Sequence, residues 1–295
     1  MSKANVAIAC CRRNADSDPQ DLYPDLDAKP LLAAFDELGA SSELVSWDDP
    51  DAKWGSFTHV LVSSTWDSVD RPDEYLAWTR AVSTNTVLVN SAPAIAWGLD
   101  KFHQARLAAV GIPVIPTTWV RHDDQWAPGE TDFVVKPAVS AGGRNTARYA
   151  AGDSAALAHV HALHLAGQTV MIQPYFSAID GEGEVDVIFI EGELSHAVLK
   201  NPVLTAGEGV VERPWERMTW GGVAILDPEQ RSVAEATIAA MVEALDEIPT
   251  YARIDLISSG DGTSVLLEVE VVDPYLSLDM EPAGAPRLAS AVLRR

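Results

Sequence analysis

Short apolar runs alternate with amphipathic segments along the first third of the chain. Runs of this length, rich in Val, Ile, Leu and Ala, are typical of buried parallel strands and occur at 5–11, 43–46, 59–63 and 86–90. Helical patterns at 28–38, before Gly39, and at 72–82 lie between them. Strands that alternate with helices predict a doubly wound α/β domain over residues 1–100. The first strand is not followed by a Gly-x-Gly-x-x-Gly turn, so a dinucleotide site is not expected there.

The pattern changes in the central part of the chain. A helix is predicted over 100–109, before Gly111. A strand at 133–136, a loop of small residues at 137–145 and a returning strand that ends at Tyr149 follow it. A helix at 154–166 and a strand at 169–173 complete the segment. These elements predict a small α+β domain over residues 101–176. The three histidines of the predicted helix 154–166 contain no pair spaced for metal binding, and we expect them on the surface.

Strand patterns dominate the last part of the chain. They occur at 185–190 and 194–199, and again in two β-rich runs within 251–272 that flank Gly260-Asp261-Gly262. A final helix is predicted to begin near Pro286. These elements predict a larger α+β domain over residues 177–295.

The last predicted hairpin carries acids where a buried strand should be apolar. Alternate strand residues share a face, so Glu268 lies beside Glu270 and Arg253 beside Asp255. A four-residue loop at 260–263 would set Asp255 opposite Glu268 and Arg253 opposite Glu270. Opposed side chains lie about 5 Å apart at Cβ, close enough to share one cation. Three carboxylates on one face repel each other unless a metal ion neutralises them, so the hairpin predicts a metal site.

The ligand atoms indicate which metal. All are oxygens, which favours Mg²⁺, or Mn²⁺ in its place, over Zn²⁺. Mg²⁺ leaves coordination positions for water and phosphate, and the planar fork of Arg253 suits phosphate oxygens. One alternative stays open: an amphipathic edge strand with a solvated acidic face and a cross-strand Arg–Glu pair. The apolar residues around the acids favour a buried strand instead.

Lys136 closes a predicted strand directly before a loop that contains Gly142 and Gly143. A lysine beside glycines suits a phosphate, because the ammonium supplies charge while bare backbone amides approach the oxygens. The order of residues differs from a Walker A loop, in which the lysine follows the glycines. Taken alone, Lys136 is equally compatible with a lysine that extends from an edge strand to solvent. A solvated surface charge is the favoured interpretation of Lys101 when it is taken alone.

Composition excludes several functions. The 295 residues carry a net charge of −22, which disfavours nucleic acids and anionic membranes as partners. The two cysteines, Cys10 and Cys11, are adjacent and cannot build an ordinary disulfide framework, so we expect them in the core. No apolar stretch has membrane-spanning length and no signal-peptide pattern is visible, so a cytoplasmic protein is expected. A homodimer is compatible with the sequence.

The order of these features resembles the ATP-grasp superfamily of carboxylate ligases over nearly the whole chain. Asp100-Lys101 and Lys136-Pro137 with the Gly-Gly loop come first, and the thirteen-residue step from Asp255 to Glu268 resembles the metal-binding step of D-alanine–D-alanine ligases. The resemblance implies an ATP-grasp fold, with ATP between the central lid domain and the C-terminal domain. It also implies ATP, two Mg²⁺ ions and a small amino-acid-like substrate.

The resemblance implies a role for each matching residue. Lys101 and Lys136 would grip the ATP phosphates, while the loop with Ser140, Gly142 and Gly143 closes over them. Arg253 would face the γ-phosphate. The adenine would be read by Gln173, Tyr175 and Phe176. The ribose hydroxyls would be held by Glu182 or Glu184, and the crowded acidic run leaves that choice open. The metal ligands would be Asp255, Glu268 and Glu270, with Glu268 as the bridge.

A finer resemblance is to a small subgroup of ring-closing ligases, carried by Ser64-Thr-Trp-Asp67, Trp97, Ser195-His-Ala-Val198 and Lys200. It implies Thr65, Asp67 and His196 as substrate residues and Lys200 as a catalytic residue. Asp67 suits a substrate ammonium, and a helix-cap or turn role is the open alternative. Relatives carry Gly-Asp-Phe-Arg shortly after the lysine. At this place the present chain instead reads Thr-Ala-Gly-Glu-Gly-Val-Val-Glu-Arg over residues 205–213. Arg213 would therefore replace the arginine of the relatives.

The function implied is an ATP- and Mg²⁺-dependent, ADP-forming ligase. It would activate a carboxylate as an acyl phosphate, which a nitrogen of the same molecule attacks to close a ring. Two alternatives stay open from the residues alone. One is an intermolecular carboxylate–amine ligase that shares the ATP residues and differs in its substrate pocket. The other is a nucleotide-binding regulator without turnover, which has little need for two lysines and three acids.

Overall fold

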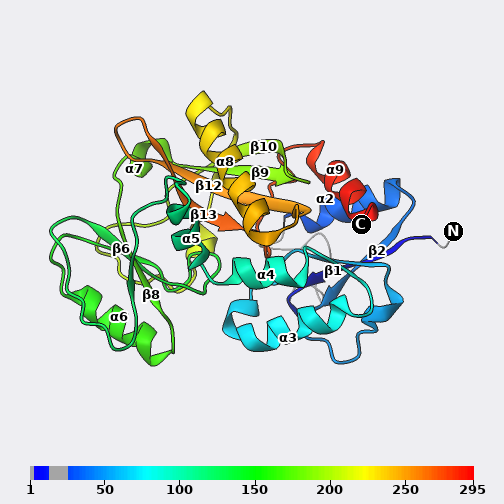
Figure 1. The fold of residues 1–295 in the computed structure, drawn as a ribbon, viewed down its shortest axis with the longest axis horizontal. Coiled ribbons are helices and arrows are strands. Elements are labelled where there is room, and N and C mark those ends of the chain that lie inside the picture. Colours follow the sequence, from blue (N-terminus) through cyan, green and yellow to red (C-terminus); the bar gives the residue numbers. More distant parts are fainter. Residues whose placement is uncertain (1–2, 13–25) are drawn as a thin grey trace.

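Three β-sheets form the framework of the protein, seen in a computed structural model that describes residues 3–12 and 26–295. The sheet built from the N-terminal segment lies at one end of the longest axis, and the sheet of the central segment lies at the other. A five-stranded sheet lies between them (Figure 1). No described helix combines the length and the apolar character needed to cross a bilayer.

The first sheet is parallel and has the strand order β2-β1-β3-β4. Its strands are β1 (Asn5–Cys10), β2 (Ser41–Ser46), β3 (His59–Val62) and β4 (Val87–Val89). Helices α2 (Ala28–Glu37) and α3 (Pro72–Ser83) connect them, with the short turns η1 (Trp54–Ser56) and η2 (Ser68–Asp70). The predicted doubly wound pattern is thus confirmed, and Cys10 and Cys11 are both buried in the core as expected.

The helices that follow differ from the prediction. Helix α4 (Ala92–Leu99) was not predicted, although Ser91 caps it by accepting a bond from the Ala94 amide at 3.1 Å. The helix predicted over 100–109 begins only at His103, as α5 (His103–Ala109). Asp100, taken for the helix start, is the C-cap of α4 in extended conformation. The two helices are therefore separate, and Lys101 lies in the link between them.

The central sheet is antiparallel, with the order β5-β8-β6-β7. It comprises β5 (Thr118–Val120), β6 (Phe133–Pro137), β7 (Ala147–Tyr149) and β8 (Val170–Pro174), packed against α6 (Ala155–Leu165). The surface placement expected for the histidines is wrong for His159, which is buried and hydrogen-bonds with Tyr149 Oη and the Asn145 carbonyl, both at 3.1 Å. Both ring nitrogens of His159 have hydrogen-bond partners within the central segment. The spacing of histidines along one helix does not reveal such partners.

The five-stranded sheet has the order β11-β10-β9-β12-β13, with all neighbours antiparallel. Its strands are β9 (Glu184–Ile190), β10 (Glu193–Lys200), β11 (Trp220–Val223), β12 (Tyr251–Ser258) and β13 (Ser264–Glu270). The short helices α7 (Ile179–Glu182) and η3 (Pro214–Arg217) precede β9 and β11. Helix α8 (Pro228–Leu245) packs on β12 and β13 and was not predicted, although Asp227 and Gln230 form a capping box at its start.

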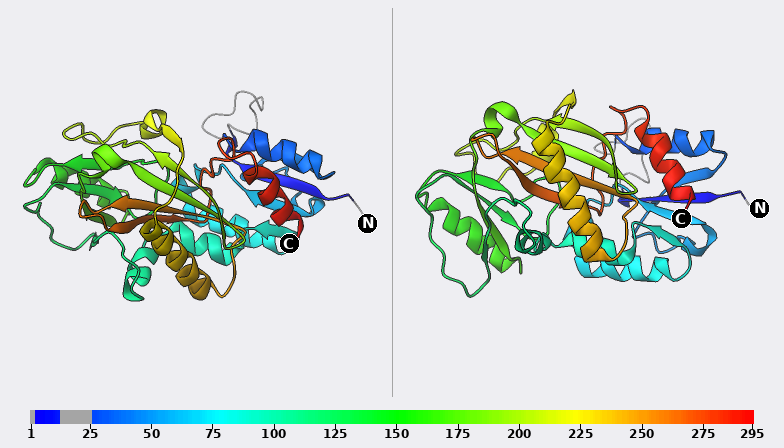
Figure 2. Two further views of the ribbon diagram at one scale, coloured as in Figure 1. Left: turned by 90° about the horizontal axis from the view of Figure 1, so that it is seen from above. Right: turned by 45° about the horizontal axis from the view of Figure 1, so that its top comes forward.

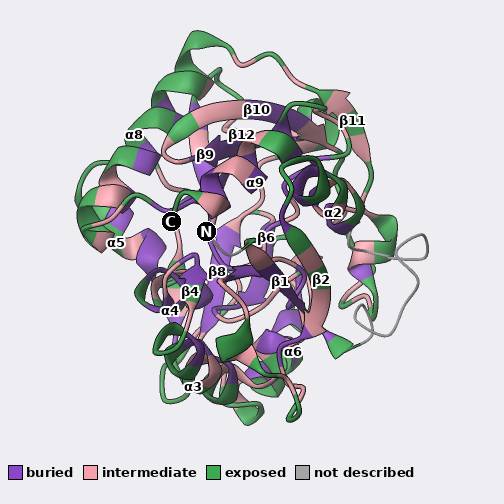
Figure 3. Ribbon diagram, turned by 90° about the vertical axis from the view of Figure 1, so that its right-hand side faces the viewer, coloured by how far each residue is buried: buried purple, intermediate pink, exposed green. Residues whose placement is uncertain are grey.

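The C-terminal helix α9 (Gly284–Leu293) returns to the N-terminal sheet and lies beside α2 in every ribbon view (Figures 1 and 2). Leu288 and Val292 of α9 share one apolar cluster with Phe35 of α2 and with Ile188 of β9. In Figure 3 the inner strands carry many buried residues, whereas much of α3 and α8 is exposed. The first and third sheets are therefore joined by a common core.

Asn90 fixes the β12–β13 hairpin against the first sheet. Its buried amide donates to the carbonyls of Tyr251 at 2.9 Å and Val271 at 3.0 Å, and its oxygen accepts from the Thr250 amide at 2.7 Å. Buried polar groups need such partners, because an unpaired one costs about 1–3 kcal/mol. The side chain at the end of β4 thus sets where the hairpin begins and ends.

Candidate active site

The register of the acidic hairpin is the one predicted from sequence. Asp255 pairs with Glu268, and Arg253 pairs with Glu270. The predicted loop length is wrong, because the last pair is Ser258 with Ser264 and five residues, 259–263, form the turn. A register shift between Asp255 and Leu256 adds one residue to β13 and restores the predicted pairing.

The extra residue of this bulge is Leu267, since Leu256 pairs with Leu266 and Asp255 pairs with Glu268. Gln104 of α5 donates from Nε2 to the Leu267 carbonyl at 2.9 Å. Leu266 exchanges backbone bonds with Pro113 and Ile115, at 2.7 and 2.9 Å. Contacts from a distant segment therefore hold the bulge and aim Glu268.

Asp255, Glu268 and Glu270 bring carboxylate oxygens within 4.8 Å of one another. Arg253 donates to both oxygens of Asp255, at 2.7 and 2.8 Å, and its Nη2 lies 3.0 Å from Glu270. Burial alone would lower the pKa of Arg253, but Asp255 and Glu270 raise it well above its ordinary value. The cross-strand Arg–Glu pair of the alternative interpretation is present. Its edge strand is present too, since β13 lies at the edge of the sheet and its two glutamates are half-buried. A fully solvated acidic face is absent, because Asp255 on the interior strand β12 is fully buried.

A second acidic group adjoins the first and was missed from sequence. Glu184, Asp186 and Asp255 also have oxygens within 4.8 Å of one another, and Asp186 pairs with Asp255 across β9 and β12. Burial and the charge of Asp255 raise the pKa of Asp186 well above its ordinary value. Neither Asp186 oxygen has a hydrogen-bond partner among the described residues. Glu184 and Asp186 are two positions apart on one strand and so share a face. This spacing is the feature of the sequence that could have indicated the second group.

Three lysines surround these acids, of which Lys101 and Lys136 are buried and Lys200 is half-buried. Lys101 donates to the Ser140 carbonyl at 2.6 Å, and its Nζ lies 2.9 Å from Glu268 Oε1, an ion pair without hydrogen-bond geometry. Lys200 donates to Glu184 at 2.8 Å. Burial alone would lower the pKa of Lys200, but Glu184 and the two aspartates raise it above its ordinary value.

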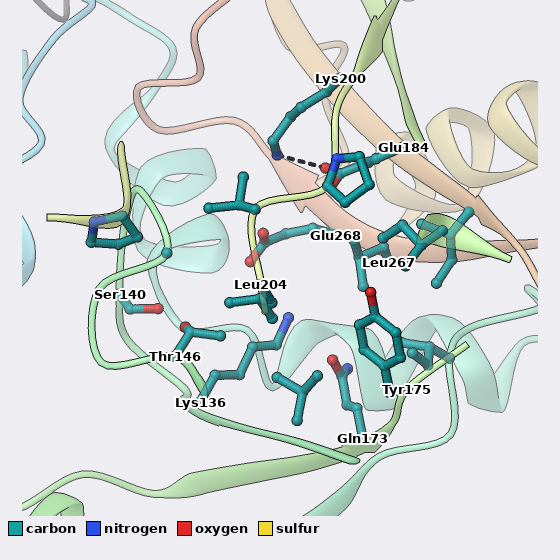
Figure 4. A pocket seen from close by; sticks show the side chains of 18 of the residues that line it. Lys136, Ser140, Thr146, Gln173, Tyr175, Glu184, Lys200, Leu204, Leu267 and Glu268 are labelled. Atoms are coloured by element: carbon teal, nitrogen blue, oxygen red, sulfur yellow. Dashed lines mark hydrogen bonds and ion pairs between the residues drawn. The ribbon is translucent and has the colours of Figure 1, made fainter. Parts of the chain in front are cut away.

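Lys136 differs from the other two lysines because no ion pair joins it to a described acid. Burial, together with the charge of Lys101, lowers the pKa of Lys136 to about 7. Its ammonium points into a cavity rather than at a carboxylate (Figure 4). An anion that entered this cavity would find a buried cation without a fixed partner.

A first cavity of about 150 Å³ lies between the central sheet and the five-stranded sheet. In Figure 4, Lys136 and Gln173 approach from one side, whereas Glu184, Lys200 and Glu268 approach from the other. The residues predicted to bind ATP or metal that line it are Lys101, Lys136, Ser140, Gly142, Gly143, Gln173, Tyr175, Phe176, Glu184, Glu268 and Glu270. The structure thus brings together, in one space, residues that are far apart in the sequence.

A second cavity of about 170 Å³ adjoins the first. The two share Gly142, Gly143, Lys200, Glu268 and Glu270 in their linings. The second lining also includes Arg253 together with aromatic and acidic side chains, among them Trp66, Trp215, Trp220, Tyr275, Asp27, Asp186 and Asp273. The carboxylates and Lys200 therefore stand at the junction of two compartments.

Comparison with known proteins agrees with this geometry. Residues 6–90 match the family model described as the N-terminal domain of D-cycloserine synthetase DcsG. Over 292 residues, 95% of this chain and 97% of the relative, the chain is 35% identical to the cycloserine biosynthesis protein DcsG of Streptomyces lavendulae. The crystal structure of D-cycloserine synthetase DcsG superposes with a TM-score of 0.86, at 32% identity, over 99% of both chains.

The chain belongs to the DcsG family.

Solved structures of other ligases share the fold of this DcsG-family chain. D-alanine–D-alanine ligase from Bacillus anthracis matches with a TM-score of 0.68 at 12% identity, over 99% of this chain and 96% of that one. An ATP-grasp RimK domain protein from Sphaerobacter thermophilus matches with a TM-score of 0.63 at 18% identity, over 98% and 100% of the two chains. The predicted ATP-grasp fold is thus confirmed. Family and fold together make the chain an ATP-dependent ligase of the ATP-grasp type.

Some predicted site residues of this DcsG-family chain lie outside the linings of both cavities. Glu182 is exposed at the end of α7, whereas Glu184 lines the first cavity. Arg213 is exposed and pairs with Glu216 at 2.9 Å. Their roles stay predictions, and the geometry favours Glu184 over Glu182 for a ligand in the first cavity.

The three predicted substrate residues have protein partners of their own. Thr65 is buried and hydrogen-bonds with Tyr75 Oη at 2.8 Å. Asp67 accepts from Trp47 Nε1 at 2.8 Å and from Arg71 at 3.3 Å. His196 hydrogen-bonds with the Leu276 carbonyl at 2.9 Å. Among these, only Thr65 contacts a described residue of the second cavity lining, by donating to Asp273 at 3.3 Å.

Proposed function

We propose that this protein converts O-ureido-D-serine to D-cycloserine by activating the substrate carboxylate with ATP, with release of ADP and phosphate. The observation that carries the proposal is the junction of two cavities at Lys200, Glu268 and Glu270. One compartment has the residues expected of a nucleotide site, and the other has room and polar groups for a small acid. The names of the DcsG relatives support cycloserine as the product.

ATP would occupy the first cavity. Tyr175 and Phe176, at its lid side, offer aromatic and apolar surface to the adenine, and Glu184 offers a carboxylate to the ribose. Lys101 and Lys136 would neutralise the phosphates, whose oxygens the amides of Gly142 and Gly143 approach without a Cβ in the way. Phosphates therefore point toward the cavity junction.

The acidic hairpin fits Mg²⁺. Asp255, Glu268 and Glu270 present only oxygen donors, close enough to share cations, and one oxygen of Glu268 lacks a hydrogen bond among the described residues. We propose that they hold two Mg²⁺ ions, or Mn²⁺ in their place, with Glu268 as the bridge. Bound there, the ions would screen the charge of the β- and γ-phosphates.

The chain's own residues then act on the reacting groups. Arg253, locked by Asp255 and Glu270, faces the second cavity and offsets the charge on the transferring phosphoryl group. The substrate carboxylate takes the γ-phosphoryl group and becomes an acyl phosphate. The oxygen-bound nitrogen of the same molecule attacks the acyl carbon, expels phosphate and closes the isoxazolidinone ring. Addition of one water removes the carbamoyl group as CO₂ and ammonia.

Ring closure within one bound molecule is favoured entropically. Fixing a nucleophile beside its target is worth up to about 7–11 kcal/mol of the barrier. The Gly142–Gly143 loop borders both cavities and would exclude the water that competes for the acyl phosphate. An intermolecular carboxylate–amine ligase would use the same ATP residues, and it differs in needing a second amine.

The test measures ADP release with O-ureido-D-serine as the only amino acid, together with product mass. We expect ADP, phosphate and cycloserine in equal amounts. Glu268→Gln should lower kcat by about 10²- to 10³-fold, because it removes charge from the metal site. Glu243→Gln, an exposed change on α8, serves as the matched control. An absolute need for an added amine would replace the cyclisation by intermolecular ligation, and absent turnover in wild type and variant alike would refute O-ureido-D-serine as the substrate.

A further inference from the structure

Most carboxylates in the lining of the second cavity already have partners. Asp27 accepts the backbone amides of Leu276 and Leu278 at 2.5 and 2.8 Å. Glu268 pairs with Lys101, and Glu270 pairs with Arg253. Asp186 lies 4.0 Å from Arg253 Nε. These acids are used within the protein or stand beside its cations.

Asp273 is the exception in this lining. It follows β13 and faces the second cavity. Its carboxylate accepts a long hydrogen bond of 3.3 Å from the Thr65 hydroxyl, and no ion pair joins it to a described basic residue. Thr65 is itself held by Tyr75, so the side of Asp273 that meets the protein is fixed. The Asp273 carboxylate also borders a smaller cavity of about 30 Å³, together with Lys101 and Glu270.

The surroundings of Asp273 are negative. Burial, together with the charge of Glu270, raises the pKa of Asp273 to about 7, and Asp67 acts in the same direction. Asp186, by contrast, stands near the cationic Lys200 and Arg253. The charge of Lys101 opposes this rise only in part, and no ion pair joins Lys101 to Asp273. The second cavity is therefore electrically asymmetric, with cations beside Asp186 and, at Asp273, a carboxylate that no described basic side chain pairs with directly. A ligand that carries both a carboxylate and an ammonium group complements this arrangement.

We propose that Asp273 binds the α-ammonium group of the substrate and thereby selects α-amino acids for activation. That the substrate is O-ureido-D-serine rests on the proposed function. That the substrate is an α-amino acid rests only on the second cavity. Asp67, the candidate from sequence, is less suited because Trp47 and Arg71 already bind its carboxylate. An ammonium on Asp273 places the neighbouring α-carboxylate within the same cavity as Arg253 and Lys200.

The test combines two changes: the charge of the Asp273 carboxylate is removed by mutation, and the α-amine is removed from the substrate. In wild type, 3-(ureidooxy)propanoic acid, which lacks the α-amine, should show a kcat/KM about 10- to 100-fold below that of O-ureido-D-serine. Asp273→Asn should lower kcat/KM for O-ureido-D-serine by a similar factor, mainly through KM, and leave KM for ATP near the wild-type value. For the analogue without the amine, Asp273→Asn should cause little further loss.

Asp67→Asn provides the comparison. This change and loss of the substrate amine should act independently, so that their reductions in kcat/KM multiply. The proposal would be overturned if the reductions also multiplied for Asp273→Asn, or if that variant kept the full preference of wild type for the substrate with the amine. Retained KM for ATP shows that the variant is folded. Asp273→Glu, which keeps the charge, should restore part of the selectivity for the amine.

Failure of the proposed function can be told apart from failure of this inference. If wild type does not convert O-ureido-D-serine, cyclisation is refuted, and binding is measured calorimetrically on enzyme loaded with a non-hydrolysable ATP analogue and Mg²⁺. The probes are D-serine and 3-hydroxypropanoate. Binding of D-serine that Asp273→Asn abolishes supports the ammonium site. Equal binding of both probes, or binding of neither, counts against it.

Discussion

Lys136 gives the free site a pH-dependent charge. Burial and the neighbouring Lys101 lower its pKa to about 7, so above that pH the free enzyme loses this proton. Phosphate favours the ammonium form, so ATP binding at pH 8 should take up a proton. ATP affinity should then fall by up to about tenfold per pH unit above 7.

Calorimetry in two buffers of different ionisation enthalpy measures this proton uptake directly. Lys136→Arg is the informative control, because a guanidinium stays charged throughout the range and should remove the dependence. Proton-neutral binding of ATP by wild type at pH 8 would show that Lys136 is charged in the free enzyme.

Single site residues could be predicted where the order of several motifs along the chain identified them. Lys101, Lys136 and the hairpin acids were recognised because several weak signals came in the order that one superfamily shows. The structure places Lys101, Lys136, Glu268 and Glu270 around one cavity. Asp273 gave no such signal. It is an acid after a strand, and its meaning depends on Thr65, which is distant in sequence and meets it only in the fold.

At the scale of elements, periodicity predicted strands better than exact turns. The hairpin register was right although the loop length was wrong, because a bulge at Leu267 compensated for the longer turn. The bulge depends on Gln104 and on the segment around Pro113, which strand propensity does not record. Helix α8 was missed because its apolar positions are diluted by alanine and polar residues, although its capping box was legible.

Gly183 orients the start of β9, and with it Glu184. Its backbone, at φ 77° and ψ −163°, occupies a region that is essentially restricted to glycine. A Cβ there would lie 2.7 Å from the Lys200 carbonyl and 2.9 Å from Leu199 Cδ1. Gly183→Ala should therefore lower the free energy of unfolding by about 1–3 kcal/mol and raise KM for ATP.

Gly181→Ala is the matched control, two residues upstream in α7. A Cβ at Gly181 meets nothing within 4 Å, and an alanine is favoured over glycine in a helix. Urea unfolding of both variants gives the comparison, and equal stability of the two would contradict the strain assigned to position 183.

At the scale of the whole molecule, one side chain links all three parts of the chain. Arg144, next to the glycine pair, forms an ion pair of 2.9 Å with Asp70 of the N-terminal segment. Its guanidinium lies 5.0 Å from the ring centroid of Trp66 and 5.2 Å from that of Trp215, and these rings stack on each other. Both tryptophans line the second cavity, so this contact ties the loop to the cavity in which we propose that the acyl phosphate forms.

Arg144→Ala should therefore admit water to the second cavity, with a smaller effect on the binding of ATP and substrate. Loss of the contacts with Asp70 and the two indoles frees the Gly142–Gly143 loop, and water then competes with the ring nitrogen for the acyl phosphate. We expect ADP release to persist while the amount of cycloserine formed per ADP falls several-fold. Arg231→Ala, which removes a surface ion pair with Glu235 on α8, should leave that ratio at one. Parallel measurement of ADP and cycloserine tests this, and an unchanged ratio in Arg144→Ala would mean that the loop stays closed without the arginine.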